Sequence, residues 1–101
     1  MIGLTAIVWA TTGALFTLGL AAVVLRRQLL AMLLGLELML AAASVSLVHH
    51  AGLFSDEQAL ASVALIIAAA AAEAVVGLAL ILRVRRSGRA AEAESLTELR
   101  G

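Results

Sequence analysis

Two acidic residues, Glu37 and Glu73, stand where a carboxyl could carry a proton through a membrane. Each is the only charged residue in a long apolar stretch, and each lies ten residues from an arginine, Arg27 or Arg83. At ~1.5 Å of rise per helical residue, each carboxyl is about 15 Å from its arginine, near the midplane of a hydrocarbon core ~30 Å thick. Removal from water disfavours the charged form of a carboxyl, so such a group can hold and release a proton. We therefore predict that the pair transfers protons.

A structural role for these glutamates is the alternative, because a carboxyl inside a span can also hydrogen-bond at a helix interface or remain protonated without a role. Its insertion costs at least ~3 kcal/mol, however, so acids inside spans are few and mostly functional. Ala41 and Ser44 follow Glu37 on one helical face. Small residues there allow close helix approach or a little water, so Ser44 is predicted to support the site. The spacing leaves open whether the two glutamates face each other.

The composition is that of an integral membrane protein. Hydrophobic residues make up 63% of the 101 residues, and the mean hydropathy is +1.10. Most of the charge is confined to short connections and the C-terminal residues, which leaves no room for a second, soluble domain. The chain has no cysteine, so it offers no thiolate for an iron–sulfur cluster and no redox dithiol. Any part that it plays in a redox system is therefore not electron carriage.

The apolar stretches predict an all-α fold of three transmembrane helices, over residues 2–25, 29–48 and 59–82. Each stretch has the length that a spanning helix needs, and a helix satisfies its own backbone hydrogen bonds in lipid. A secretion signal is excluded for the first stretch, because no positive region precedes it and the run is too long. We expect one membrane domain over residues 1–86 and a polar tail over residues 87–101. The tail is either frayed or a short docking segment.

The arginines predict the orientation in the membrane. Arg26 and Arg27 occupy the short first connection, four arginines follow the third stretch, and the second connection, residues 49–57, has no Arg or Lys. The positive-inside rule then places the N-terminus and the second connection in the periplasm and the C-terminus in the cytoplasm. The bacterial inner membrane, as the expected location, is what the family resemblance of the motifs below implies.

The second connection contains two further features. Ser55 and Gln58 have the spacing of a capping box at the start of the third helix. His49 and His50 are adjacent, so on a helix they would point about 100° apart, unlike the i, i+4 pairs that chelate metals. We therefore expect these histidines to anchor the membrane interface rather than to bind a metal.

Three motifs resemble one known family. Residues 25–40 read Leu-Arg-Arg-Gln-Leu-Leu-Ala-Met-Leu-Leu-Gly-Leu-Glu-Leu-Met-Leu, residues 70–80 read Ala-Ala-Ala-Glu-Ala-Val-Val-Gly-Leu-Ala-Leu, and the chain closes with Ser-Leu-Thr-Glu-Leu-Arg-Gly. These runs are similar to the second-helix, third-helix and tail motifs of the NuoK family, the smallest core membrane subunits of proton-pumping NADH:quinone oxidoreductase (complex I). The resemblance covers essentially the whole chain.

The resemblance implies three transmembrane helices packed between larger membrane subunits, including antiporter-like ones. It implies that Glu37 and Glu73 are the family's intramembrane carboxylates in the proton-transfer and coupling path, and that Arg26 and Arg27 are its cytoplasmic-loop arginines. Flavin, iron–sulfur clusters and quinone would belong to other parts of the complex, and this chain would bind no cofactor or metal and no nucleic acid. One departure is Ala41, where many members of the family have an asparagine.

Two other functions stay open at this point. The C subunit of multisubunit sodium/proton antiporters is related and of similar size, although the paired glutamates and the tail favour complex I. A non-catalytic membrane scaffold would need neither carboxylate. On the preferred interpretation the chain is a non-redox, ion-translocating subunit of an enzyme, without catalytic activity of its own.

Overall fold

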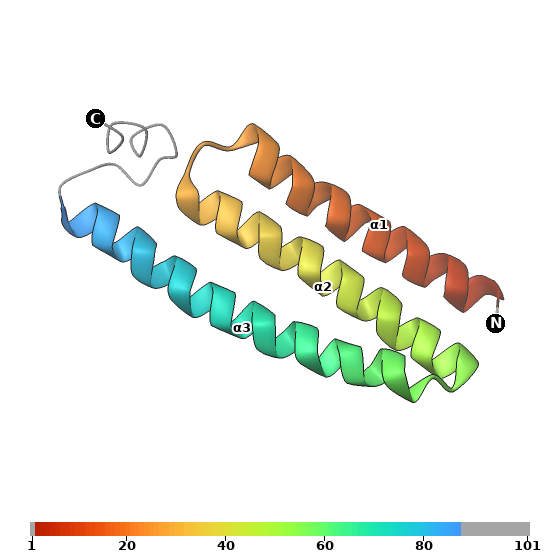
Figure 1. The fold of residues 1–101 in the computed structure, drawn as a ribbon. Helices are drawn as coiled ribbons and strands as arrows, with labels where there is room; N and C mark the ends of the chain where they lie inside the picture. Colours follow the sequence, from red (N-terminus) through yellow and green to blue (C-terminus); the bar gives the residue numbers. More distant parts are fainter. Residues whose placement is uncertain (1, 88–101) are drawn as a thin grey trace.

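Three long helices form a single layer, in which α2 lies between α1 and α3 (Figure 1). The structure is a computed structural model and describes residues 2–87. The helices are α1 (Ile2–Leu25), α2 (Leu29–Phe54) and α3 (Glu57–Arg86). All three are long and apolar enough to cross a membrane, which confirms the predicted all-α fold of three spanning helices. The polar tail beyond residue 87, predicted as frayed or docking, lies outside the described residues.

The second helix is longer than predicted, and the prediction that His49 and His50 belong to a loop was wrong. Helix α2 continues to Phe54, so both histidines lie in its last turns. The helix ends because Ser55 adopts a left-handed conformation, with φ 50 and ψ 44, and the amides of Ser55 and Asp56 both bond back to the carbonyl of Ala51. Residues 49–54 contain no proline, so no residue there removes a helix hydrogen bond, and the helix ends only at the left-handed Ser55.

The residue that caps α3 is Asp56, and not Ser55 as the capping-box pattern predicted. The Asp56 side chain accepts a hydrogen bond from the amide of Ala59 at 3.0 Å. Ser55 cannot serve as the N-cap because it already closes α2 in a left-handed conformation, whereas an N-cap residue is extended. The connection between α2 and α3 is therefore only Ser55 and Asp56, which holds these helices antiparallel.

Two glycines bring the backbones of α1 and α2 together. A Cβ added to Gly19 would lie 2.5 Å from the carbonyl oxygen of Gly35, and one added to Gly35 would lie 2.5 Å from the carbonyl oxygen of Gly19. Both distances are far shorter than an ordinary contact, so only glycine fits at either position. Close approach of this kind is how helices associate in lipid, where packing rather than water drives the contact.

The three helices bury little of their own surface. The buried side chains are small or medium in size, and they are Thr12, Ala42, Ala51, Ala59, Val63 and Ile81. Large apolar side chains stay exposed along every helix, including Trp9, Leu34 and Leu65. A layer one helix thick with this surface needs lipid or further helices on both faces.

Candidate functional site

The packing of α2 on α3 places the two intramembrane glutamates at the same depth. The side chain of Leu33 on α2 occupies the space next to Gly77 on α3, and a Cβ on Gly77 would lie 2.9 Å from Leu33 Cδ1. On α2, Glu37 lies one turn after Leu33. On α3, Glu73 lies one turn before Gly77. Because the helices are antiparallel, these steps lead to the same level (Figure 1). The two carboxyls therefore lie at the same depth in the membrane.

Glu37 is the more enclosed of the two acids. It lies on the side of α2 that faces α3, since it shares the face of Leu33. The residue is half-buried, and its Oε1 atom is fully buried with no hydrogen-bond partner among the described residues 2–87. Burying such a polar atom is costly unless it gains a partner, so Glu37 is a site where a proton or a hydrogen-bond donor would be stabilising.

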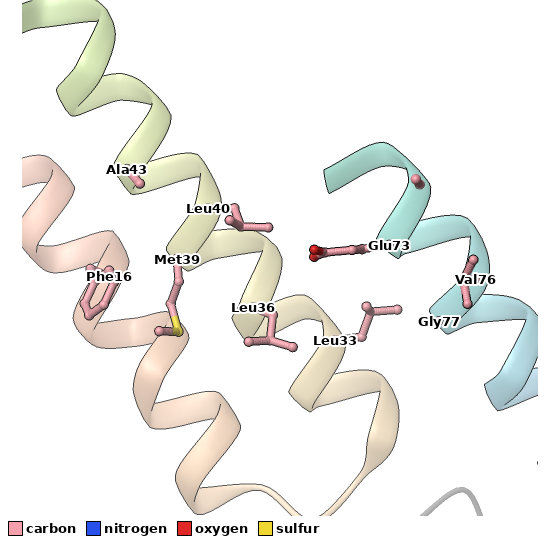
Figure 2. A pocket seen from close by; sticks show the side chains of 10 residues that line it. Phe16, Leu33, Leu36, Met39, Leu40, Ala43, Glu73, Val76 and Gly77 are labelled. Atoms are coloured by element: carbon pink, nitrogen blue, oxygen red, sulfur yellow. The ribbon is translucent and has the colours of Figure 1, made fainter. Parts of the chain in front are cut away.

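Glu73 has a different environment, because it lines an open groove. The groove has a volume of about 830 Å³ and is lined by one residue of α1, five of α2 and four of α3; they are Phe16, Leu33, Leu36, Met39, Leu40, Ala43, Ala72, Glu73, Val76 and Gly77. Figure 2 shows the Glu73 carboxyl extending from α3 toward α2, in the direction of Leu40. Glu37 is not among the lining residues, so the acids share a depth but open to different surroundings.

The predicted supporting residues are spread along the chain. Ser44 is half-buried two turns from Glu37 on the same face of α2. Arg26 and Arg27 are exposed in the connection between α1 and α2, at the same end of the layer as Arg83 at the end of α3 (Figure 1). The arginine clusters thus gather at one end, whereas both acids lie near the middle of their helices.

The two histidines contact different neighbours at the opposite end. His49 Nε2 lies 3.1 Å from the Thr5 hydroxyl oxygen, which ties α2 to α1. His50 Nε2 lies 3.8 Å from Asp56 Oδ2, next to the cap of α3, and its ring lies 4.8 Å from that of Phe54. Among the described residues, no group of three His, Cys, Asp or Glu side chains could hold a metal ion. His49 therefore connects the end of α2 with α1, and His50 connects it with the start of α3.

Several contacts that shape this site had only weak signals in the sequence. Gly19, Gly35 and Gly77 are three of eight glycines, and nothing in their spacing alone distinguishes those at helix contacts from Gly3 or Gly52, which face open space. The Thr5 to His49 contact joins residues far apart in the chain and needs the observed extension of α2.

Comparison with known proteins gives consistent matches over the whole chain. Residues 4–101 match the family described as NADH-ubiquinone/plastoquinone oxidoreductase chain 4L. The chain is 42% identical over 99 residues to NADH-quinone oxidoreductase subunit K of Methylacidiphilum infernorum, an alignment that covers 98% of this chain and 97% of that relative. It is 38% identical over 92 residues to the protein of the same name from Deinococcus radiodurans, covering 91% and 89% of the two chains.

Proposed function

This chain belongs to the NADH-ubiquinone/plastoquinone oxidoreductase chain 4L family, in which its relatives are named subunit K, and from that premise we propose that Glu37 and Glu73 form part of the proton-transfer path of the enzyme. The resemblance to the NuoK family drawn from the helix motifs is confirmed by these matches. By its family, the chain is therefore a membrane subunit of a multisubunit oxidoreductase. The antiporter alternative has no support among these named relatives.

The proposal is supported chiefly by the common depth of the two carboxyls. Proton transfer through a membrane needs groups that gain and lose a proton away from bulk water. Glu37 has a buried oxygen that no described residue hydrogen-bonds, and Glu73 reaches into a groove that could admit water or a side chain. Two acids level with each other but with different surroundings could pass a proton laterally, parallel to the membrane plane, through a bridging water or a neighbouring subunit.

The remaining elements of the proposal concern the assembly. The other membrane subunits of the oxidoreductase, including antiporter-like ones, cover the exposed helix faces. Flavin, iron–sulfur clusters and quinone are bound elsewhere in the complex; for the clusters the reason is that this chain has no cysteine to ligate iron. The end of the layer that carries the arginines faces the cytoplasm, and the end that carries His49 lies on the periplasmic side of the inner membrane. In this arrangement the chain couples quinone-linked redox changes to proton movement and performs no redox step itself.

Replacement of Glu37 by glutamine tests the proposal directly. Glutamine keeps the size and hydrogen-bonding reach of a protonated glutamate but cannot exchange a proton. We expect Glu37→Gln to assemble normally, while quinone-linked NADH oxidation and the proton gradient both fall, because pumping is coupled to electron transfer. Glu73→Gln should act in the same direction, and less severely where water bypasses the more open site. Glu37→Asp keeps an acid at shorter reach and should retain partial activity.

The readouts are NADH:quinone turnover in membranes, the proton gradient from a fluorescent probe, and the yield of intact complex. Artificial-acceptor NADH oxidation by the peripheral part of the enzyme serves as the control, since it needs no proton path. If Glu37→Gln assembled, turned over and pumped like the parent, Glu37 would have a structural role and a scaffold function would replace this proposal.

A further inference from the structure

The outer face of α3 brings two arginines together next to apolar side chains. A hollow near the end of this helix is lined, among the described residues, by Ala79, Leu82, Arg83 and Arg86. These residues are three or four positions apart, so they share one face of the helix. Gly77, which contacts α2, points about 160° away from Ala79 at ~100° per residue. The shared face therefore points away from α2, at the edge of the three-helix layer (Figure 1).

An apolar run continues this face from the arginines toward the middle of the membrane. It consists of Leu82, Ala79 and Val75, all exposed, with Leu82 at 54% and Val75 at 68%. The distance along the axis from Arg83 to Val75 is about 12 Å at ~1.5 Å per residue. One leaflet contributes about half of a hydrocarbon core ~30 Å thick, so the apolar run spans most of a leaflet. The face thus matches an acyl chain in length and ends in two cations.

The two arginines have no acidic partner in the part of the chain that the structure describes. The acids of residues 2–87 are Glu37, Asp56, Glu57 and Glu73. The two glutamates inside the spans lie about 15 Å deeper than Arg83, and the other two acids lie at the opposite end of α3. A guanidinium stays charged and presents a planar fork of donors that fits a phosphate. This face therefore offers a site for an anion at the level of the lipid headgroups.

We infer that the outer face of α3 binds a phospholipid with a net negative charge, with its phosphate at Arg83 and Arg86 and an acyl chain along the apolar run. Basic clusters next to a transmembrane helix attract anionic lipids. A zwitterionic phospholipid carries a cation beside its phosphate, so it neutralises the arginines less well. A free phosphate ion would leave the apolar run uncovered. Subunits packed on the two broad faces of the layer leave this edge to lipid, and the inference does not depend on the proposed proton path.

Photolabelling of the intact complex tests the site. The complex is placed in phosphatidylcholine nanodiscs with a trace of phosphatidylglycerol that carries a diazirine in its acyl chain, and phosphatidylcholine with the same chain is the matched probe. We expect the phosphatidylglycerol probe to label residues 75–82 severalfold more than the matched probe. Excess unlabelled phosphatidylglycerol should remove the label, whereas inorganic phosphate should not.

Arg85 supplies a matched control for charge, because it is exposed next to Arg86 but does not line the hollow. A basic residue near an anionic lipid strengthens binding about fivefold. We therefore expect labelling to fall about fivefold in Arg83→Gln or Arg86→Gln and about twenty-five-fold in the double variant. Labelling should stay close to the parental level in Arg85→Gln. Lysine at both positions keeps the charge and should retain most of the label.

Four results would overturn the inference: no preference of α3 for the charged probe, equal loss of label in Arg85→Gln and Arg86→Gln, removal of the label by inorganic phosphate, or a label that appears only after deletion of residues 88–101. The second result would indicate a diffuse attraction to the basic end, and the fourth would indicate that the tail with its glutamates occupies the site. The comparison of probes and the competition use only the parental complex, so they decide the question even where a variant does not assemble.

Discussion

The contact between Gly19 and Gly35 yields a prediction whose size can be worked from the structure. The methyl group of Gly35→Ala would lie 2.5 Å from the carbonyl oxygen of Gly19, 2.9 Å from Val23 Cγ2 and 3.0 Å from Ala22 Cβ. Two of these neighbours cannot turn aside, because one is backbone and the other is a Cβ. Helices α1 and α2 must therefore move about 1 Å apart to restore ordinary contact distances.

The cost follows from the packing that this movement disrupts. A gap of that size forfeits roughly a quarter to a half of the dispersion attraction between the atoms concerned, and overpacking of this kind typically costs about 1 to 3 kcal/mol. The better helix propensity of alanine returns at most about 1 kcal/mol. We expect a net loss of about 1 to 2 kcal/mol for Gly35→Ala, and a larger loss for Gly35→Val.

The matched control is Gly52→Ala on the same helix, since a Cβ at Gly52 has no atom of the described residues within 4 Å. The assays are the fraction of the chain that co-purifies with a tagged neighbouring subunit and the melting temperature of the purified complex. We expect both values to fall for Gly35→Ala and to stay at the parental level for Gly52→Ala. Equal assembly and equal melting temperature of the two variants would refute the close backbone contact.

Three further predictions concern the ends of the helices. Asp56→Ala should destabilise the start of α3 by about 0.5 to 2 kcal/mol, seen as faster amide exchange there, whereas Asp56→Ser should preserve most of the cap; equal exchange in both variants would contradict the capping. A cysteine in place of Gly52 should react with an impermeant thiol reagent from the periplasmic side, and one in place of Ser87 from the cytoplasmic side; the reverse pattern would invert the proposed orientation. Arg26→Ala combined with Arg27→Ala should lower turnover or the yield of complex, compared with neutralising two acidic residues of the tail, and equal tolerance of both changes would remove these arginines from the coupling.

Features that depend on local sequence were largely predictable. A run of apolar residues long enough to cross a bilayer forms a helix because the backbone has no other way to satisfy its hydrogen bonds in lipid. The three spans therefore followed from composition, and the α1 bounds matched the prediction. The helix boundaries near Ser55 did not follow, because several residues there could cap and only the left-handed turn at Ser55 selects Asp56. The family also followed from the sequence, since Glu37 and Glu73 lie in specific motifs.

What the sequence alone determined is the depth of each glutamate along its own helix and the end at which the arginines gather. Helical rise converts position in the chain directly into distance along the axis. The tertiary structure decided what each glutamate faces: Glu37 shares the face of α2 on which Leu33 contacts α3, and Glu73 opens into the groove beside α2. Helical periodicity relates residues only within one helix, whereas the face that meets a neighbour depends on which side chains interlock. Here the close contacts at Gly35 and Gly77 set the rotation of each helix about its own axis, and no local pattern in the sequence specifies this rotation.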